Sequence, residues 1–148
     1  MKRRLLVAAL GAFALAPFAL AQAPAPTEAT LYKNPDCGCC DEHANYLRRH
    51  GYAVKVVETH DLDGLKRRHG VPEPLHGCHT IEIDGYVVEG HVPAGPLARL
   101  LRERPAIRGI SLPGMPTGSP GMTGPKREPF RIYVIERGAA TPRLYAVE

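Results

Sequence analysis

The chain has 148 residues, a formal net charge of +4 and a hydrophobic content of 44%. That length suits one globular domain with a modest apolar core. There is no Trp, aromatic residues make up 6% of the chain, and no stripe of Lys and Arg follows any one segment. A nucleic-acid-binding surface therefore has little support in the sequence.

The first residues have the three parts of a secretory signal peptide. Basic residues at 2–4 precede an almost wholly apolar run over 5–20, and the small residues of 19–21 suit cleavage. A membrane anchor is the weaker interpretation, because the run is short for a span of about 20 residues and Pro17 interrupts it. We expect residues 1–21 to be removed, leaving a nearly neutral protein that is exported to the periplasm and does not contact the membrane.

The mature chain is predicted to be one domain behind a short linker. Residues 22–28 are rich in Ala and Pro and lack an apolar pattern, so they form the linker, and residues 29–148 form the domain. Apolar spacing, β-branched runs and Gly or Pro boundaries predict the first elements of this domain. They are a strand at 29–33, a helix at 41–50, a strand at 52–58, a helix at 61–69, a hairpin of strands at 80–83 and 86–90, and a helix at 93–104.

This β-α-β-α-β-β-α order predicts an α/β fold with a thioredoxin-like core that begins with a parallel βαβ unit. Residues 107–111 lead into a Gly- and Pro-rich loop, 112–125, in which Pro-Gly-Met occurs twice, seven residues apart. A loop of this length is usually functional or disordered. Residues 130–135 and 143–147 predict a C-terminal β extension, paired as a hairpin across Gly138.

Three of the four cysteines lie within four residues, at Cys37, Cys39 and Cys40. We expect them at the turn between the first strand and the first helix, where free backbone N–H groups and the helix dipole favour a thiolate over a thiol. His43 follows Cys39 and Cys40 at helical spacing, so its imidazole and the thiolates can share one face. The segment is therefore expected to supply good nucleophiles or soft-metal ligands.

Four cysteines in an exported protein also allow two disulfides. Because Cys39 adjoins Cys40 and only Gly38 separates it from Cys37, the plausible pairing is Cys37–Cys40 with Cys39–Cys78. Metal binding is the favoured interpretation, since three thiols at one helix start are a poor arrangement for stapling a fold.

Four motifs in the same order resemble the CopG-type copper-resistance proteins, a bacterial family once known only as one of unknown function. They are Cys37-Gly38-Cys39-Cys40, Gly77-Cys78-His79-Thr80, Glu89-Gly90-His91-Val92-Pro93 and the loop segment 113–122. The resemblance implies an exported, thioredoxin-like protein that binds copper through its cysteines and contributes to copper tolerance. It implies no proven catalytic activity.

If the core is thioredoxin-like, Cys78 lies opposite the first helix, and His79 takes the position at which that fold usually has a cis-proline. The proline that keeps metal away from the cysteines is then absent, and Cys78 supplies a fourth sulfur. Sulfur-rich sites select Cu(I), zinc or iron–sulfur clusters. The crowded cysteines fit a relaxed tetrahedral zinc cage poorly, so we expect Cu(I) in a thiolate-bridged cluster, with zinc as the weaker alternative.

Imidazoles and thioethers are further candidate ligands. His43, His79 and His91 can bind the metal or hold another ligand in place, and the alternative for His43 and His79 is a surface position. Met115 and Met122 lie in a loop that could fold over the site, although methionine also fills gaps between turns. The candidate metal ligands are therefore Cys37, Cys39, Cys40, Cys78, His43, His79, His91, Met115 and Met122.

The sequence favours an exported copper-binding protein that sequesters or transfers Cu(I), with copper ions and other exported copper-handling proteins as partners. The alternative is a thiol-disulfide oxidoreductase in which Cys37 attacks and Cys40 resolves. The absent proline and the extra sulfurs of Cys39 and Cys78 count against the enzyme, so we assign no catalytic residue.

Overall fold

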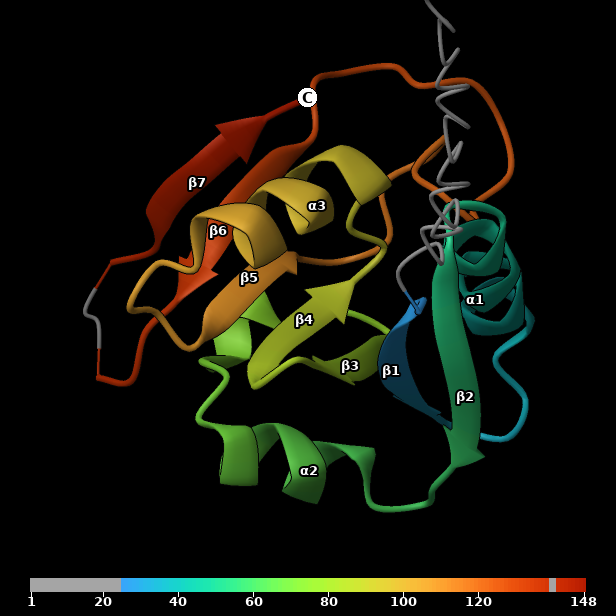
Figure 1. Cartoon of the computed structure of the whole chain (residues 1–148), viewed down its shortest axis with the longest axis horizontal. Helices are drawn as coiled ribbons and strands as arrows, with labels where there is room; N and C mark the ends of the chain where they lie inside the picture. Colours follow the sequence, from blue (N-terminus) through green and yellow to red (C-terminus); the bar gives the residue numbers. More distant parts are fainter. Residues whose placement is uncertain (1–24, 139–140) are drawn as a thin grey trace, which may run out of the picture.

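A computed structural model describes residues 25–138 and 141–148 (Figure 1). The predicted signal peptide, 1–21, and the first part of the linker lie outside the described residues. The first strand begins at Thr27, two residues ahead of the expected domain start at Ala29. Among the described helices, none is both long and apolar enough to cross a membrane.

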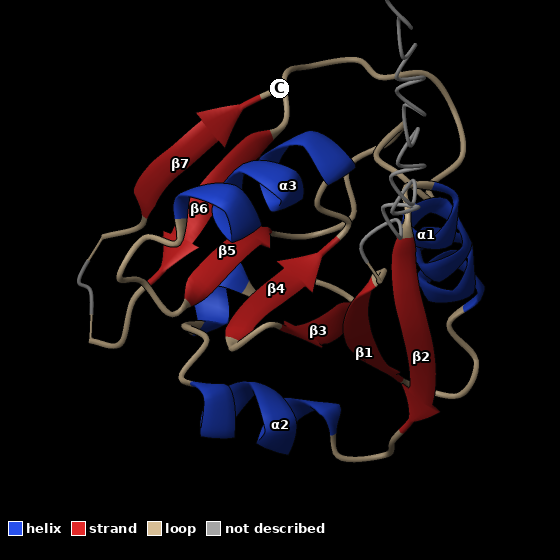
Figure 2. Cartoon of the chain, in the orientation of Figure 1, coloured by secondary structure: helices blue, strands red, loops and turns tan. Residues whose placement is uncertain are grey.

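Strands and helices alternate through the first part of the described chain (Figure 2). In chain order, the elements are β1 (Thr27–Lys33), α1 (Gly38–Arg49), β2 (Tyr52–Glu58), α2 (Leu62–His69), the short 3-10 helix η1 (Glu73–Leu75), β3 (His79–Ile83), β4 (Tyr86–Gly90), α3 (Ala94–Glu103), β5 (Gly109–Leu112), β6 (Arg131–Ile135) and β7 (Arg143–Val147).

The seven described strands form one sheet, in the order β2-β1-β3-β4-β5-β6-β7. β1 and β2 are parallel, β3 runs antiparallel to both β1 and β4, and β4 and β5 are parallel. Leaving η1 aside, the chain up to α3 follows the predicted β-α-β-α-β-β-α order, and the α/β class is confirmed. The likeness of this core to thioredoxin stays a prediction.

The C-terminal extension is larger than the sequence predicts. β6 and β7 pair antiparallel, as expected of the terminal hairpin. The sequence predicts no strand at β5, which pairs in parallel with β4 and antiparallel with β6. All four of its residues are buried, so a short run becomes a central strand through pairing on both sides.

α1 begins three residues before the predicted helix. Its N-cap is Cys37, whose backbone N–H donates to the Asn34 carbonyl at 3.2 Å. Asp41 lies in the first turn, where its carboxylate accepts a hydrogen bond from Lys33 Nζ at 2.9 Å. Cys39 and Cys40 therefore lie within the first turn of α1, whereas the predicted helix began after them.

The sheet separates two apolar clusters of unequal size. The larger joins the sheet to α1 and α3 and contains Leu47, Leu97 and Val88. The smaller contains Leu75 and Val87. Neighbouring residues of a strand face opposite sides of the sheet. Along β3 and β4, the residues that alternate with those of the larger cluster therefore point toward the face on which α2 lies.

Candidate metal centre

The first turn of α1 presents cysteines at one end of the sheet. The backbone N–H groups of a first turn have no partner within the helix, and the helix dipole is positive there. Lys33, at the end of β1, is buried. Its Nζ atom donates to the carbonyls of Pro35 at 3.0 Å and Cys37 at 3.4 Å. Lys33 therefore holds the loop before α1 and places a positive charge beside it.

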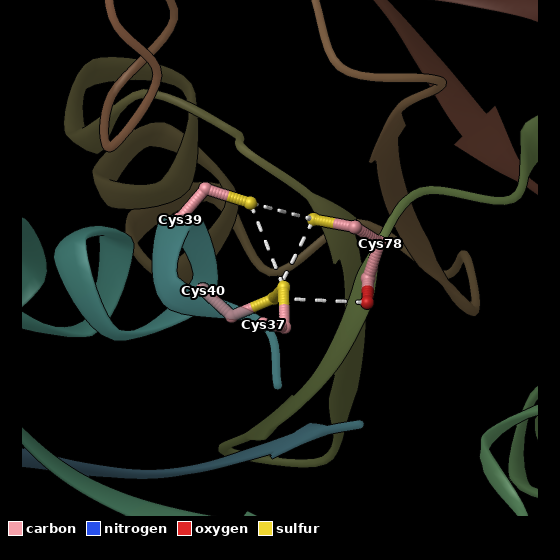
Figure 3. Close-up of side chains that lie close together, drawn as sticks. All are labelled: Cys37, Cys39, Cys40 and Cys78. Atoms are coloured by element: carbon pink, nitrogen blue, oxygen red, sulfur yellow. Dashed lines mark hydrogen bonds between the residues drawn. A yellow bond between two sulfur atoms is a disulfide. The ribbon is translucent and has the colours of Figure 1, made fainter. Parts of the chain in front are cut away.

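The cysteine cluster, Cys37, Cys39, Cys40 and Cys78, joins two segments that lie far apart in the sequence (Figure 3). The Sγ atom of Cys78 lies 3.6 Å from that of Cys40 and 3.9 Å from that of Cys39. Cys39 Sγ lies 3.5 Å from Cys37 Sγ, and all four sulfur atoms are within 4.8 Å of one another. Because Cys78 immediately precedes β3, the pairing of β3 with β1 brings it to α1.

Two of these sulfur atoms are bonded to each other. Cys37 and Cys40 form a disulfide, while Cys39 and Cys78 are free thiols. The other disulfide of the predicted pairing, Cys39–Cys78, is not formed. The structure thus describes an oxidised form, in which Cys37 and Cys40 can offer thiolates to a metal only after reduction.

The histidine trio, His43, His79 and His91, lies beside the cysteine cluster. His43 belongs to α1, His79 opens β3 and His91 follows β4. All three side chains have 0% exposure, and one ring nitrogen of each lies within 4.8 Å of the others. The surface position considered as the alternative for His43 and His79 is therefore wrong.

Backbone carbonyls fix the tautomers of two of these histidines. His91 Nδ1 lies 2.7 Å from the Pro120 carbonyl oxygen, and His43 Nε2 lies 3.0 Å from that of Val92. Since a carbonyl can only accept, these two nitrogens carry the ring protons of the neutral histidines. His43 Nδ1 then accepts from His79 Nε2 at 2.8 Å. Lone pairs are left on His79 Nδ1 and His91 Nε2.

These two lone pairs face Cys78. Its Sγ atom lies 2.8 Å from His91 Nε2 and 3.3 Å from His79 Nδ1. In the metal-free protein the thiol can donate a hydrogen bond to one of these nitrogens, and a metal ion bound to Cys78 would meet the same lone pairs. His43 differs, because hydrogen bonds occupy both of its nitrogens.

Burial keeps the histidines uncharged and Cys78 protonated. It lowers the pKa of His43 to about 3, with His91 adding to the effect, and it lowers the pKa of both His79 and His91 from the usual value. Burial, together with the neighbouring Cys39, raises the pKa of the Cys78 thiol to about 12. Metal binding at Cys78 must therefore displace a proton, whereas the imidazoles are already neutral.

The Gly- and Pro-rich loop packs directly on this site. The Pro120 carbonyl binds His91. Gly121 approaches α1 so closely that a Cβ atom in its place would lie 2.6 Å from the backbone nitrogen of His43 and 2.7 Å from the carbonyl oxygen of Cys39. The loop therefore contacts both α1 and His91, the residue that follows β4.

The two candidate methionines differ in position. Met122 is half-buried, follows Gly121 at α1, and its N–H donates to the Ser119 carbonyl at 2.8 Å. Met115 is 56% exposed, which leaves its side chain at the surface of the loop. A ligand role for either thioether stays a prediction.

A buried ion pair that the sequence does not single out lies on the α2 side of β3. Lys66 of α2 and Glu89 of β4 form a salt bridge, and their side chains are 3% and 0% exposed. Lys66 begins the basic run 66–68, which is typical of a solvated helix face. The only signal was Glu89 itself, an acidic residue in the otherwise apolar run 86–90.

A mixed α/β fold that gathers four sulfur atoms and three buried imidazoles at one end of its sheet defines a protein with a candidate soft-metal site. Residues 75–122 match the family model described as a protein of unknown function, DUF411. Two solved structures, described as forms 1 and 2 of the copper resistance protein CopG, are each 35% identical to the chain, with TM-scores of 0.75 and 0.76.

Both alignments cover 83% of this chain and 98% of the solved one. The chain belongs to the CopG family of copper-resistance proteins. No curated protein matches the chain.

Proposed function

We propose that this is an exported protein that binds Cu(I) at its cysteine cluster and sequesters or transfers it, contributing to copper tolerance. The observation that carries the proposal is the convergence of four sulfur atoms within 4.8 Å. Thiolates are soft donors that suit Cu(I). The related structures, named for copper resistance, support the same metal.

The sulfur separations alone do not distinguish copper from zinc. The preference for copper rests on the soft sulfur donors and on the similarity to the CopG structures. Sγ atoms 3.5 to 3.9 Å apart also suit a tetrahedral zinc ion, whose ligands at about 2.3 Å lie about 3.8 Å from one another. Three cysteines at one helical turn can instead share their sulfurs between several Cu(I) ions. Zinc is the weaker alternative, and a parallel zinc titration tests it.

Reduction of the Cys37–Cys40 disulfide completes the donor set. Breaking the bond takes two electrons and two protons, which a pair of thiols can supply while being oxidised to a disulfide. The reduced protein then offers four thiols, and each thiol that binds copper releases a proton. The oxidised protein offers only Cys39 and Cys78 with the nearby imidazoles, so it should bind less copper.

A Cu(I) titration of the fully reduced protein, in competition with a chromophoric chelator, tests the proposal. The Cys37→Ser/Cys39→Ser/Cys40→Ser variant should lose more than about 100-fold in affinity, because losing direct ligands should exceed the roughly 10- to 100-fold cost of losing a supporting residue. His60→Gln, at an exposed position, is the control and should bind as wild type does. Equal Cu(I) uptake by wild type and the triple variant would end the proposal.

A thiol-disulfide oxidoreductase is the second candidate function, and the Cys37–Cys40 disulfide at the start of α1 favours it. An assay with a small disulfide substrate and a thiol reductant separates the two. The enzyme requires turnover that Cys37→Ser abolishes and Cys78→Ser keeps. The copper-binding function requires Cys78→Ser to weaken Cu(I) binding.

The proposal includes export and a single folded unit. Residues 1–21 are the expected signal peptide, 22–28 the linker and 29–148 the metal-binding domain in the periplasm. Other exported copper-handling proteins are the expected partners in transfer.

A further inference from the structure

The start of β3 is enclosed by a buried network of charged and polar groups. Lys66 Nζ contacts Glu89 Oε1 and donates to the Gly77 carbonyl at 3.1 Å and to Thr80 Oγ1 at 3.2 Å. Glu89 Oε1 also accepts from the Gly77 N–H at 2.8 Å, and Glu89 Oε2 accepts from the Thr80 hydroxyl at 2.7 Å. The Lys66–Glu89 ion pair therefore forms hydrogen bonds to the chain at two residues, Gly77 and Thr80.

These two points lie on either side of Cys78. Both backbone polar groups of Gly77, the preceding residue, are bonded to the pair, and Thr80 anchors the chain two residues after Cys78. Gly77 also packs tightly on β4, since a Cβ atom there would lie 2.5 Å from Gly90 Cα. The backbone that carries the fourth sulfur is therefore fixed from both ends.

Burying this ion pair costs free energy, so packing alone does not explain its presence. Removing two charges from water is expensive, and apolar side chains of similar size can often replace a buried ion pair without loss of stability. Here the contacts of both charges converge on the Cys78 segment.

We propose that the Lys66–Glu89 pair is a positioning device that holds the Cys78 sulfur against the sulfurs of α1 and thereby sets the Cu(I) affinity of the cysteine cluster. The inference rests on the proposed function, because copper affinity is its measure. Lys66 and Glu89 act through Cys78 and are not themselves ligands.

A double-mutant cycle with Cys78 tests this positioning role. Cu(I) affinity is measured on the fully reduced protein against a chromophoric chelator, for wild type, Lys66→Met and Lys66→Met/Glu89→Leu. Both variants should bind Cu(I) about 10- to 100-fold more weakly, as is typical when the support of a ligand is lost. In a Cys78→Ser background the same substitutions should cause no further loss, because the sulfur through which they act is gone.

Stability measurements separate positioning from packing. Lys66→Met leaves the Glu89 carboxylate buried and unpaired, whereas the double variant removes both charges and should regain much of the lost stability. Affinity should remain low in both. Ile132→Ala is the matched control, since Ile132 is buried on β6, two strands away from β4. It should lose stability and keep wild-type affinity.

Two outcomes would overturn the positioning role. The first is that the double variant regains wild-type Cu(I) affinity when it regains stability. The second is that Lys66→Met lowers Cu(I) affinity in the Cys78→Ser protein as much as it does in the wild type. If Lys66→Met alone fails to fold, the double variant decides the matter. Equal Cu(I) uptake by wild type and the triple serine variant would instead contradict the proposed function, so the two failures are distinguishable.

Discussion

Single hydrogen bonds decide which atoms of the site are free to bind. Each member of the histidine trio gives one ring N–H to a backbone carbonyl or to a neighbouring ring. Such bonds orient an imidazole and fix its tautomer. They leave His79 Nδ1 and His91 Nε2 facing Cys78, and they make His43 a support for His79 rather than a partner of the sulfurs.

The buried histidines make the metal-free protein sensitive to acid. Their pKa values are lowered on folding, to about 3 for His43, whereas unfolded histidine titrates at about 6.5. Below that pH the unfolded chain binds more protons, so the stabilisation is present above pH 6.5 and is lost as the pH falls. At pH 5 each histidine that stays neutral should cost about 2 kcal/mol of unfolding free energy. Urea unfolding of metal-free protein between pH 7 and pH 5 measures this.

His43→Gln should flatten that pH dependence, because glutamine does not titrate. His60→Gln, at an exposed position, should leave it unchanged. An unfolding free energy that is constant from pH 7 to pH 5 would contradict the neutral, buried state of the trio.

The residues that gather at the candidate site could be predicted from the sequence, but the groups that hydrogen-bond to them could not. Spacing and motifs pointed to the four cysteines and to His43, His79 and His91, which the structure brings together. The carbonyls of Pro120 and Val92 could not be predicted as partners, since any residue carries a carbonyl and only the backbone path places it. Lys66 was missed for a related reason, because a basic residue on a predicted helix is normally solvated.

At the scale of elements, the Gly- and Pro-rich loop is a structural part of the site. It has little regular structure, yet Gly121 lies against the first turns of α1 and the neighbouring carbonyl binds His91. Gly121 has a φ of +87°, which L side chains rarely adopt. The loop can therefore pack here only with glycine at this position.

Gly121→Ala tests that contact. A positive φ costs an alanine roughly 1–2 kcal/mol, and the collision of the new Cβ with the α1 backbone should add about 1–3 kcal/mol. Gly51→Ala is the matched control, since Gly51 has a φ of +88° and open space around it. Urea unfolding should show a larger loss of stability for Gly121→Ala than for Gly51→Ala. Equal losses would mean that the loop moves away from α1 at no cost.

Elements with strong local signals were predicted well, and those that depend on pairing were not. β2 has its predicted bounds, and the Asp84-Gly85 turn joins β3 and β4 as expected. β5 was missed because four residues carry little periodicity, and its burial comes from β4 and β6. The start of α1 was misplaced because Cys37, which caps it without a side-chain hydrogen bond, gives no capping signal.

At the scale of the whole molecule, the two faces of the sheet have different roles. α1 and α3 cover the larger apolar core, and the candidate metal centre lies where α1, β3 and the loop meet. α2 covers the other face and carries Lys66 toward β3 and β4. Because β3 lies between β1 and β4, this one strand links the cysteine cluster, the histidine trio and the buried ion pair.

Copper X-ray absorption on the reduced, Cu(I)-loaded protein tests most directly whether the two cysteine segments form one copper site. The account predicts copper surrounded mainly by sulfur in the wild type, with fewer sulfur neighbours in Cys78→Ser and an unchanged spectrum in His60→Gln. Copper bound chiefly by nitrogen and oxygen, or a spectrum that Cys78→Ser leaves unchanged, would contradict it.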